Sequence, residues 1–173
     1  QTLWAGPWMI RVAGYTPLES ATGLFWINVT MLLAFFIFGY ILPKITKLGF
    51  KTMRLMKIGL PVSYLFLLII IISGENAGTI HFTMYILTSI VLTLAQPAVA
   101  LSFPTSLAGK SLTSFNLLIF VGTFIMQWGI GLVIDLSQYL GKGETQSFQI
   151  SFIVYLIICI LSYSYFIMKN KNE

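Results

Sequence analysis

Few side chains in this 173-residue sequence could carry out chemistry. The chain has one histidine, His81, and one cysteine, Cys159, which we place on opposite sides of a membrane, so they cannot form a catalytic pair. The motifs of nucleophilic serine sites, zinc sites and phosphate-binding loops do not occur. We therefore expect no catalytic residue, no metal site and no cofactor, and we expect that the protein is not an enzyme.

The remaining polar candidates are neutral and stand within apolar stretches. Asn116, Thr123 and Gln127 are separated by seven and four residues, so they share one face of a helix. That face could line a path for a small solute, with Asn28 as a weaker candidate from an earlier stretch. It could equally bind a neighbouring helix through hydrogen bonds, and both interpretations stay open.

Two prolines in a later stretch are candidates for a hinge or gate. Gln96 precedes Pro97, which removes a backbone N–H and bends a helix. Gln96 could satisfy the freed carbonyl or face a substrate, and Pro104 would add a second bend near the end of the stretch. The alternative is a kink whose polar groups are satisfied by neighbouring helices, which membrane proteins tolerate.

The composition decides what kind of elements must position these residues. Hydrophobic residues make up 57% of the chain and charged residues only 9%, whereas a soluble domain has about 25% charged residues. So few charges cannot cover a surface that faces water. The composition excludes a soluble globular enzyme, a disordered chain, a coiled coil and a disulfide scaffold.

Five apolar runs reach or approach the roughly 20 residues that a helix needs to cross a bilayer. None contains Asp, Glu, Lys or Arg, and none alternates as the strands of a barrel do. Backbone groups in lipid need partners within their own segment, so the runs should be helices. We predict an all-α, polytopic transmembrane bundle, with one membrane domain over 1–173 and spans at Ala21–Leu42, Ile58–Ser73, Ile80–Ser102, Leu112–Ile134 and Phe148–Met168.

The residues before the first full span predict a short additional helix. Thr16, Pro17 and Glu19 form a helix-start signal, so the next helix should begin near Pro17. Gln1–Val12 is apolar but too short to span, and its Trp4 and Trp8 are typical of a membrane–water interface. We expect the outer half of a spanning helix whose beginning is missing, with an amphipathic interfacial helix as the alternative.

The basic residues predict the orientation in the membrane. Of ten, eight fall in loops on one side of the five spans and two, Arg11 and Lys142, on the other. Cytoplasmic loops carry the excess of Lys and Arg, so the eight-residue side and the C-terminus should be cytoplasmic. The net charge of +5 is thus a topology signal, with anionic lipid as a weaker interpretation, and we expect no nucleic-acid partner. The eight are Lys44, Lys47, Lys51, Arg54, Lys57, Lys110, Lys169 and Lys171.

In three stretches the sequence resembles the C-terminal half of a major facilitator superfamily transporter. Leu3–Trp8 is similar to the outer end of the seventh helix in a bacterial branch of that family, and Gly39–Gly49 to the glycine-and-basic loop between helices eight and nine. Phe103–Lys110, followed by Asn116, is similar to the loop between helices ten and eleven. The family usually has an aspartate where this chain has Pro43, so Gly39 and Pro43 are gate candidates without that carboxylate.

The resemblance implies a function and partners. Such transporters have two six-helix bundles that rock about a central site at mid-membrane. This chain would be one bundle with a truncated first helix, and its partners would be the lipid bilayer, a small soluble substrate and an N-terminal six-helix half or a second chain. The implied location is the bacterial inner membrane. The rival hypothesis is a membrane scaffold or assembly subunit, in which the polar residues only join helices.

Overall fold

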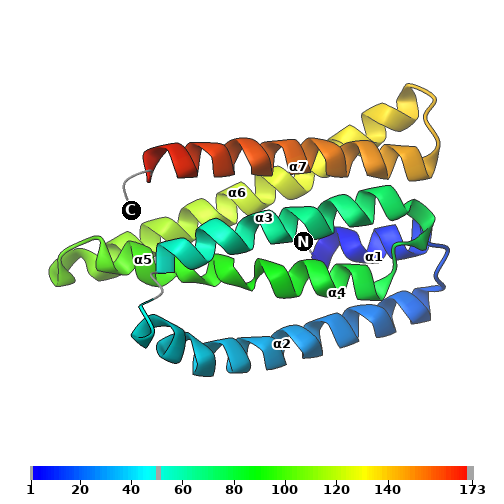
Figure 1. The fold of residues 1–173 in the computed structure, drawn as a ribbon. Coiled ribbons are helices and arrows are strands. Elements are labelled where there is room, and N and C mark those ends of the chain that lie inside the picture. The colour runs from blue at the N-terminus through cyan, green and yellow to red at the C-terminus, as the bar shows by residue number, and fades with distance from the viewer. Residues whose placement is uncertain (1, 50–51, 171–173) are drawn as a thin grey trace.

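The computed structural model describes residues 2–49 and 52–170, and within these ranges the chain is helical and contains no strand. The predicted all-α bundle is therefore confirmed (Figure 1). The elements are α1 (Thr2–Arg11), α2 (Pro17–Lys47), α3 (Thr52–Ser73), η1 (Gly74–Asn76), α4 (Thr79–Thr88), η2 (Ser89–Leu94), α5 (Ala95–Leu101), α6 (Thr105–Tyr139) and α7 (Glu144–Lys169).

Five helical segments of the described chain are long and apolar enough to cross a membrane. The segments α4, η2 and α5 follow one another without a loop and form one of these spans, Thr79–Leu101. Only 6% of the most apolar stretch of α2, and the same share of α6, is buried within the bundle. Side chains this apolar and this exposed need lipid around them, because water would not solvate them. The chain is an integral membrane protein.

The two ends of the bundle differ in charge. At one end lie the α1–α2, α3–α4 and α6–α7 connections, on the right of Figure 1, together with Glu19, Glu75 and Glu144. At the other end lie the α2–α3 and α5–α6 connections and the end of α7. We call these the acidic end and the basic end. The basic end carries Lys44, Lys47, Arg54, Lys57, Lys110 and Lys169, while Lys51 and Lys171 lie outside the described residues.

Helix α1 is a central part of the core. Trp8 is fully buried, stacks on Phe152 with ring centroids 4.8 Å apart, and donates its indole N–H to the Ala77 carbonyl over 3.1 Å. Trp8 therefore lies inside the bundle at the level of the α3–α4 connection, which contains Ala77. With its one polar atom paired, the indole can bury its whole apolar body between helices. Ala5 and Met9 are also fully buried, so α1 packs within the bundle.

The start of α2 follows the predicted signal. The Thr16 hydroxyl accepts from the Glu19 N–H over 3.2 Å, and the Glu19 carboxylate accepts from the Thr16 N–H over 2.8 Å. This capping box confirms that the helix begins at Pro17. At its other end α2 continues through Gly39 and Pro43 to Lys47. Most of the stretch expected as a loop is thus helical, and the turn comes only at Leu48 and Gly49.

Small residues allow the helices to approach closely. A β-carbon added at Gly23 in α2 would lie 2.5 Å from the Thr79 hydroxyl of α4. One added at Gly59 in α3 would lie 2.6 Å from a methyl group of Val91 in η2. Membrane helices pack by such small-residue contacts because lipid gives them little hydrophobic driving force to associate.

The third full-length span changes its helical geometry in the middle. The 3-10 segment Ser89–Leu94 lies directly before Gln96 and Pro97, where the sequence predicts a bend. The proline ring crowds the carbonyl four residues earlier, that of Thr93, so the regular α-helical ladder is disturbed there. Pro104 does not bend this span, which ends at Leu101. Instead it is the N-cap residue of α6.

Candidate functional site: a neutral cavity between the helices

A cavity of about 590 Å³ lies between the helices of the bundle. This volume is within the range of small-molecule sites in proteins. The residues that line it come from six helices: Trp4, Asn28, Met31, Leu67, Phe82, Tyr85, Ile86, Leu118, Ile119, Gly122, Thr123, Met126, Gln127, Ile130, Phe152 and Tyr155.

The cavity lining includes neutral polar side chains from two helices, which we call together the polar wall. Asn28 lies near the middle of α2, and Thr123 and Gln127 lie near the middle of α6. The lining includes no Asp, Glu, Lys, Arg or His. Three of the five residues that the sequence suggested for a solute path therefore meet at one cavity.

These three side chains keep hydrogen-bonding capacity that the described residues do not use. The Asn28 amide donates to the Leu24 carbonyl of its own helix over 2.7 Å, which leaves its side-chain oxygen free to accept. Among the described residues, no side-chain hydrogen bond is formed by the Thr123 hydroxyl or by the Gln127 amide. Asn28 and Thr123 are exposed and Gln127 is partly buried, so these groups are accessible to water or a polar ligand.

Elsewhere in the bundle, many hydroxyl groups are satisfied locally. Thr83 donates to the Thr79 carbonyl over 2.8 Å, Ser89 to the Tyr85 carbonyl over 2.7 Å, and Ser151 to the Phe148 carbonyl over 2.8 Å. Such bonds to the preceding turn let a hydroxyl stay inside a membrane helix without an external partner. The Thr123 hydroxyl differs from them: it forms no such bond to a carbonyl of the preceding turn, although its place in a helix would allow one.

The rest of the cavity lining is mostly aromatic and aliphatic. Phe82 and Tyr85 of α4 and Phe152 and Tyr155 of α7 contribute to it. The hydroxyl groups of Tyr85 and Tyr155 lie 3.5 Å apart and form a hydrogen bond. Neither tyrosine was among the candidates that the sequence suggested, because helical spacing alone cannot distinguish a packed tyrosine from one that borders a cavity.

Trp4 joins the polar wall to α1. Its indole N–H donates to the backbone carbonyl of Gln127 over 3.1 Å. A β-carbon added at Gly131 would lie 3.4 Å from the same indole ring, so the ring packs closely against α6 there. Trp4 is half-buried and lines the cavity.

Asn116 and Gln96 form a separate pair. Asn116 precedes Thr123 by seven residues, or about 10 Å of helix, toward the basic end. Its side-chain oxygen accepts from the Gln96 amide over 3.1 Å, which links α6 to α5. Neither residue lines the cavity. The polar face predicted on α6 is thus divided into a paired residue and two residues that line the cavity.

The other gate candidates lie away from the cavity. Gly39 and Pro43 are exposed on α2, and a β-carbon added at Gly39 would meet nothing within 4 Å. Pro97 is exposed on α5 next to the Gln96–Asn116 pair, and Pro104 is exposed between α5 and α6. The structure brings none of these four residues to the cavity lining.

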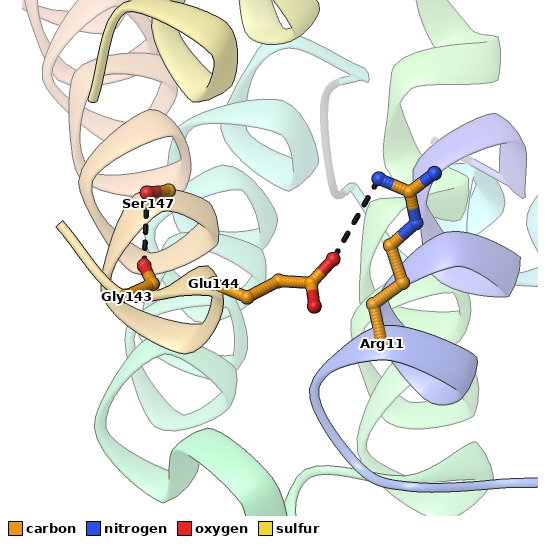
Figure 2. Close-up of polar contacts among 4 residues, drawn as sticks. All are labelled: Arg11, Gly143, Glu144 and Ser147. Atoms are coloured by element: carbon orange, nitrogen blue, oxygen red, sulfur yellow. Dashed lines mark hydrogen bonds and ion pairs between the residues drawn. The ribbon is translucent and has the colours of Figure 1, made fainter. Parts of the chain in front are cut away.

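An ion pair lies across the acidic end. Figure 2 shows the Glu144 carboxylate at the start of α7 reaching Arg11 at the end of α1, with an N–O distance of 3.6 Å. Ser147 donates to the Gly143 carbonyl over 2.9 Å and so completes the first turn of α7. Both charged side chains are about half exposed, so the pair contributes at most about 1 kcal/mol.

The described residues contain no group of three His, Cys, Asp or Glu side chains that could hold a metal ion. His81 accepts from the Gly78 N–H over 3.3 Å at the start of α4, so its imidazole caps a helix. The site therefore consists of neutral hydrogen-bonding groups together with aromatic and aliphatic side chains. No protein family model, curated protein or solved structure matches the chain.

Proposed function

We propose that this membrane protein moves a small solute across the bilayer by alternating access, as one six-helix bundle of a transporter similar to the major facilitator superfamily. The observation that carries the proposal is the polar wall formed by Asn28, Thr123 and Gln127 at one cavity near the middle of α2 and α6. The proposal also rests on the sequence resemblance described above.

Among the described residues, two of these polar side chains, Thr123 and Gln127, are unpaired within an apolar bundle. A helix pair held together by polar side chains should show them bonded to each other or to the backbone. Thr123 and Gln127 lack such bonds among the described residues, whereas Asn116 on the same helix has one. Polar groups held unpaired at mid-depth support a path that a hydrated solute enters.

The same arrangement offers a way for the bundle to move. The 3-10 segment Ser89–Leu94 adjoins the cavity-lining part of α4, and Gln96 beyond it holds α6 through Asn116. In the proposed mechanism this bond is made while the path is closed toward the basic end. It breaks when α5 moves away from α6, and a second bundle completes the path on the far side of the cavity.

The charge of the two ends supports an orientation. We place the basic end and the C-terminus in the cytoplasm of a bacterial cell, since loops rich in Lys and Arg stay inside. The protein would then be an inner-membrane protein with its acidic end outward. The proposal includes no enzymatic step, because the cavity offers neither a nucleophile–base pair nor a charged acid or base.

The second candidate is a membrane scaffold or assembly subunit. The bond between Gln96 and Asn116 favours it, because that pair joins two helices. In a scaffold, however, the cavity would be filled by lipid or by a partner, and it would never open to both faces of the membrane.

Accessibility to a thiol reagent distinguishes the two candidates. In a chain carrying Cys159→Ala, Gln127→Cys is tested against Ile125→Cys, which lies on the outward face of α6 and is 54% exposed. A charged, membrane-impermeant maleimide is applied to right-side-out and to inverted membrane vesicles. A transporter should show labelling of Gln127→Cys from both faces and none of Ile125→Cys. Labelling from neither face, or from one face alone, would reject alternating access.

A further inference from the structure

A surface groove of about 450 Å³ lies between the last turn of α3 and the first turns of α7. Ile71 and Ile72 of α3 form one side of it, and Gln149, Ile150 and Ile153 of α7 form the other. Its lining shares no residue with that of the cavity between the helices. We call it the α3–α7 groove, and a ligand that it holds is bound apart from the proposed solute path.

The part of the groove nearest the α6–α7 connection carries a lysine and amide side chains. Lys142 of that connection and Gln146 in the first turn of α7 are both exposed. Among the described residues, Lys142 takes part in no ion pair. The Gln149 amide donates to the Ile71 carbonyl over 2.8 Å, so its side chain is held in place and its oxygen is free to accept. A phosphate beside this lysine would be bound both by charge and by N–H donors.

The carboxylates of the acidic end do not line the groove. Glu144 is directed toward Arg11 of α1, with an N–O distance of 3.6 Å (Figure 2). Glu75 in η1 accepts from the Thr145 hydroxyl over 3.4 Å. Of the described residues that line the groove, Lys142 alone is ionisable. An anion in the groove therefore meets one positive charge that no lining carboxylate neutralises.

The rest of the groove is apolar and lies at the depth of lipid hydrocarbon. Helix α7 has 26 residues and is about 39 Å long, close to the whole thickness of a bilayer with its headgroups. Its first residues, and Lys142 before them, therefore lie at headgroup level. Ile153 lies about 14 Å farther along the helix than Glu144, which exceeds the roughly 6 Å of one headgroup layer. Ile72 and Ile153 are 73% and 42% exposed, so the groove is open to an acyl chain.

From this cation at headgroup level above an apolar channel, we infer that the α3–α7 groove binds an anionic phospholipid of the leaflet at the acidic end. Lys142 pairs with the phosphate, and the Gln146 amide donates to the phosphate or to an ester carbonyl below it. One acyl chain lies along Ile150 and Ile153. The inference depends on the membrane location of the chain and is independent of the proposed transport.

Photo-crosslinking of the full chain in nanodiscs tests the inference. The bilayer is digalactosyl diacylglycerol, which has acyl chains but no phosphate. The probe is a small fraction of phosphatidylglycerol with a diazirine in one acyl chain, and the matched probe is digalactosyl diacylglycerol with the same diazirine. We expect the phosphatidylglycerol probe to crosslink residues 149–153 saturably and about fivefold more than the matched probe does. Equal crosslinking of this segment by the two probes would overturn the inference.

Matched variants assign the crosslinking to the groove. Lys142→Gln should lower crosslinking of residues 149–153 by the phosphatidylglycerol probe about fivefold, whereas Lys110→Gln, which removes an exposed lysine at the basic end, should leave it unchanged. Crosslinking around Phe120, which is 74% exposed on α6, should be the same in all chains. An unchanged yield at residues 149–153 in Lys142→Gln, or an equal loss in both variants, would overturn the inference.

A second pair of variants tests the apolar part of the groove. Ile150→Trp fills the groove and should abolish crosslinking of its α7 side, while Leu161→Trp, at a 64% exposed position of the same helix, should not. Saturable crosslinking that persists at residues 149–153 in Ile150→Trp would show that the acyl chain lies elsewhere and would contradict the inference.

Discussion

The indole N–H of Trp4 donates to the backbone carbonyl of Gln127 over 3.1 Å, and the Gln127 side chain borders the cavity at the same point. This bond joins α1 to α6, two helices that are remote in the sequence. The bond holds α6 in place at Gln127, whose side-chain amide is available to a ligand. Trp4 is therefore a positioning residue for Gln127 as well as part of the cavity lining.

Replacing Trp4 by Phe should weaken this link while keeping an aromatic ring against Gly131. The expected loss in the free energy of unfolding is about 0.5–1.5 kcal/mol, the typical net contribution of one hydrogen bond. Reversible unfolding in mixed detergent micelles measures it. Unchanged stability would contradict the positioning role.

Trp8 should be the most sensitive aromatic residue of the core. Trp8→Ala removes a fully buried ring, so we expect a loss of about 3–5 kcal/mol in the free energy of unfolding. Trp8→Phe should lose less, because it retains a ring but leaves the Ala77 carbonyl without the indole N–H. Trp128→Ala serves as the control, since Trp128 is 60% exposed and should tolerate the change. A larger loss for Trp128→Ala than for Trp8→Ala would show that the core is assigned wrongly.

The crossing of α2 and α4 depends on the absence of a side chain at Gly23. Gly23→Ala would place a methyl group 2.5 Å from the Thr79 hydroxyl, so we expect about 1–3 kcal/mol of destabilisation from overpacking. Gly39→Ala in the same helix meets open space and should be neutral or stabilising by up to about 1 kcal/mol through helix propensity. Adding Thr79→Ala to Gly23→Ala should restore part of the loss. Thermal unfolding of the four chains in one detergent compares them, and equal effects of the two glycine changes would refute the close crossing.

The Gln96–Asn116 bond should be measurable as a coupling between two side chains. A double-mutant cycle with Gln96→Leu and Asn116→Leu should give a coupling free energy of about 0.6 kcal/mol, typical of a hydrogen bond between membrane helices. The corresponding cycle with Thr123→Val and Gln127→Leu should give a coupling near zero, since these side chains form no bond with each other. A coupling found only between Thr123 and Gln127 would contradict the structure, in which Gln96 and Asn116 are the bonded pair.

Local signals and apolar runs were sufficient to predict that the five apolar runs are helical, but not that α2 continues through Gly39 and Pro43 to Lys47. Thr16 and Glu19 satisfy each other within one turn, so neighbouring residues alone determine where α2 begins. The burial of Trp8 could not be predicted, because its partner, the Ala77 carbonyl, is brought near only by the packing of α1 against the α3–α4 connection.

The cavity could be predicted only in part, for a similar reason. Helical spacing placed Asn116, Thr123 and Gln127 on one face, and the structure shows that only the last two border the cavity. Asn116 differs because Gln96 of another helix reaches it, and spacing within one helix contains no information about that neighbour. Tyr85 was missed because a tyrosine in an apolar run looks the same in sequence whether it packs against a helix or borders a cavity.

The most direct test of the account is the stability of the chain after its cavity hydroxyl and amide are removed. The free energy of unfolding in mixed micelles is measured for Thr123→Val and Gln127→Leu, with Asn116→Leu as the reference for a paired residue. If Thr123 and Gln127 bind a solute and do not join helices, both variants should be as stable as the unaltered chain or more stable, because an unpaired polar group has been removed. Asn116→Leu should lose stability, because it breaks a hydrogen bond. A loss of about 1 kcal/mol or more in Thr123→Val and Gln127→Leu would show that they hold helices together and would contradict the transport site.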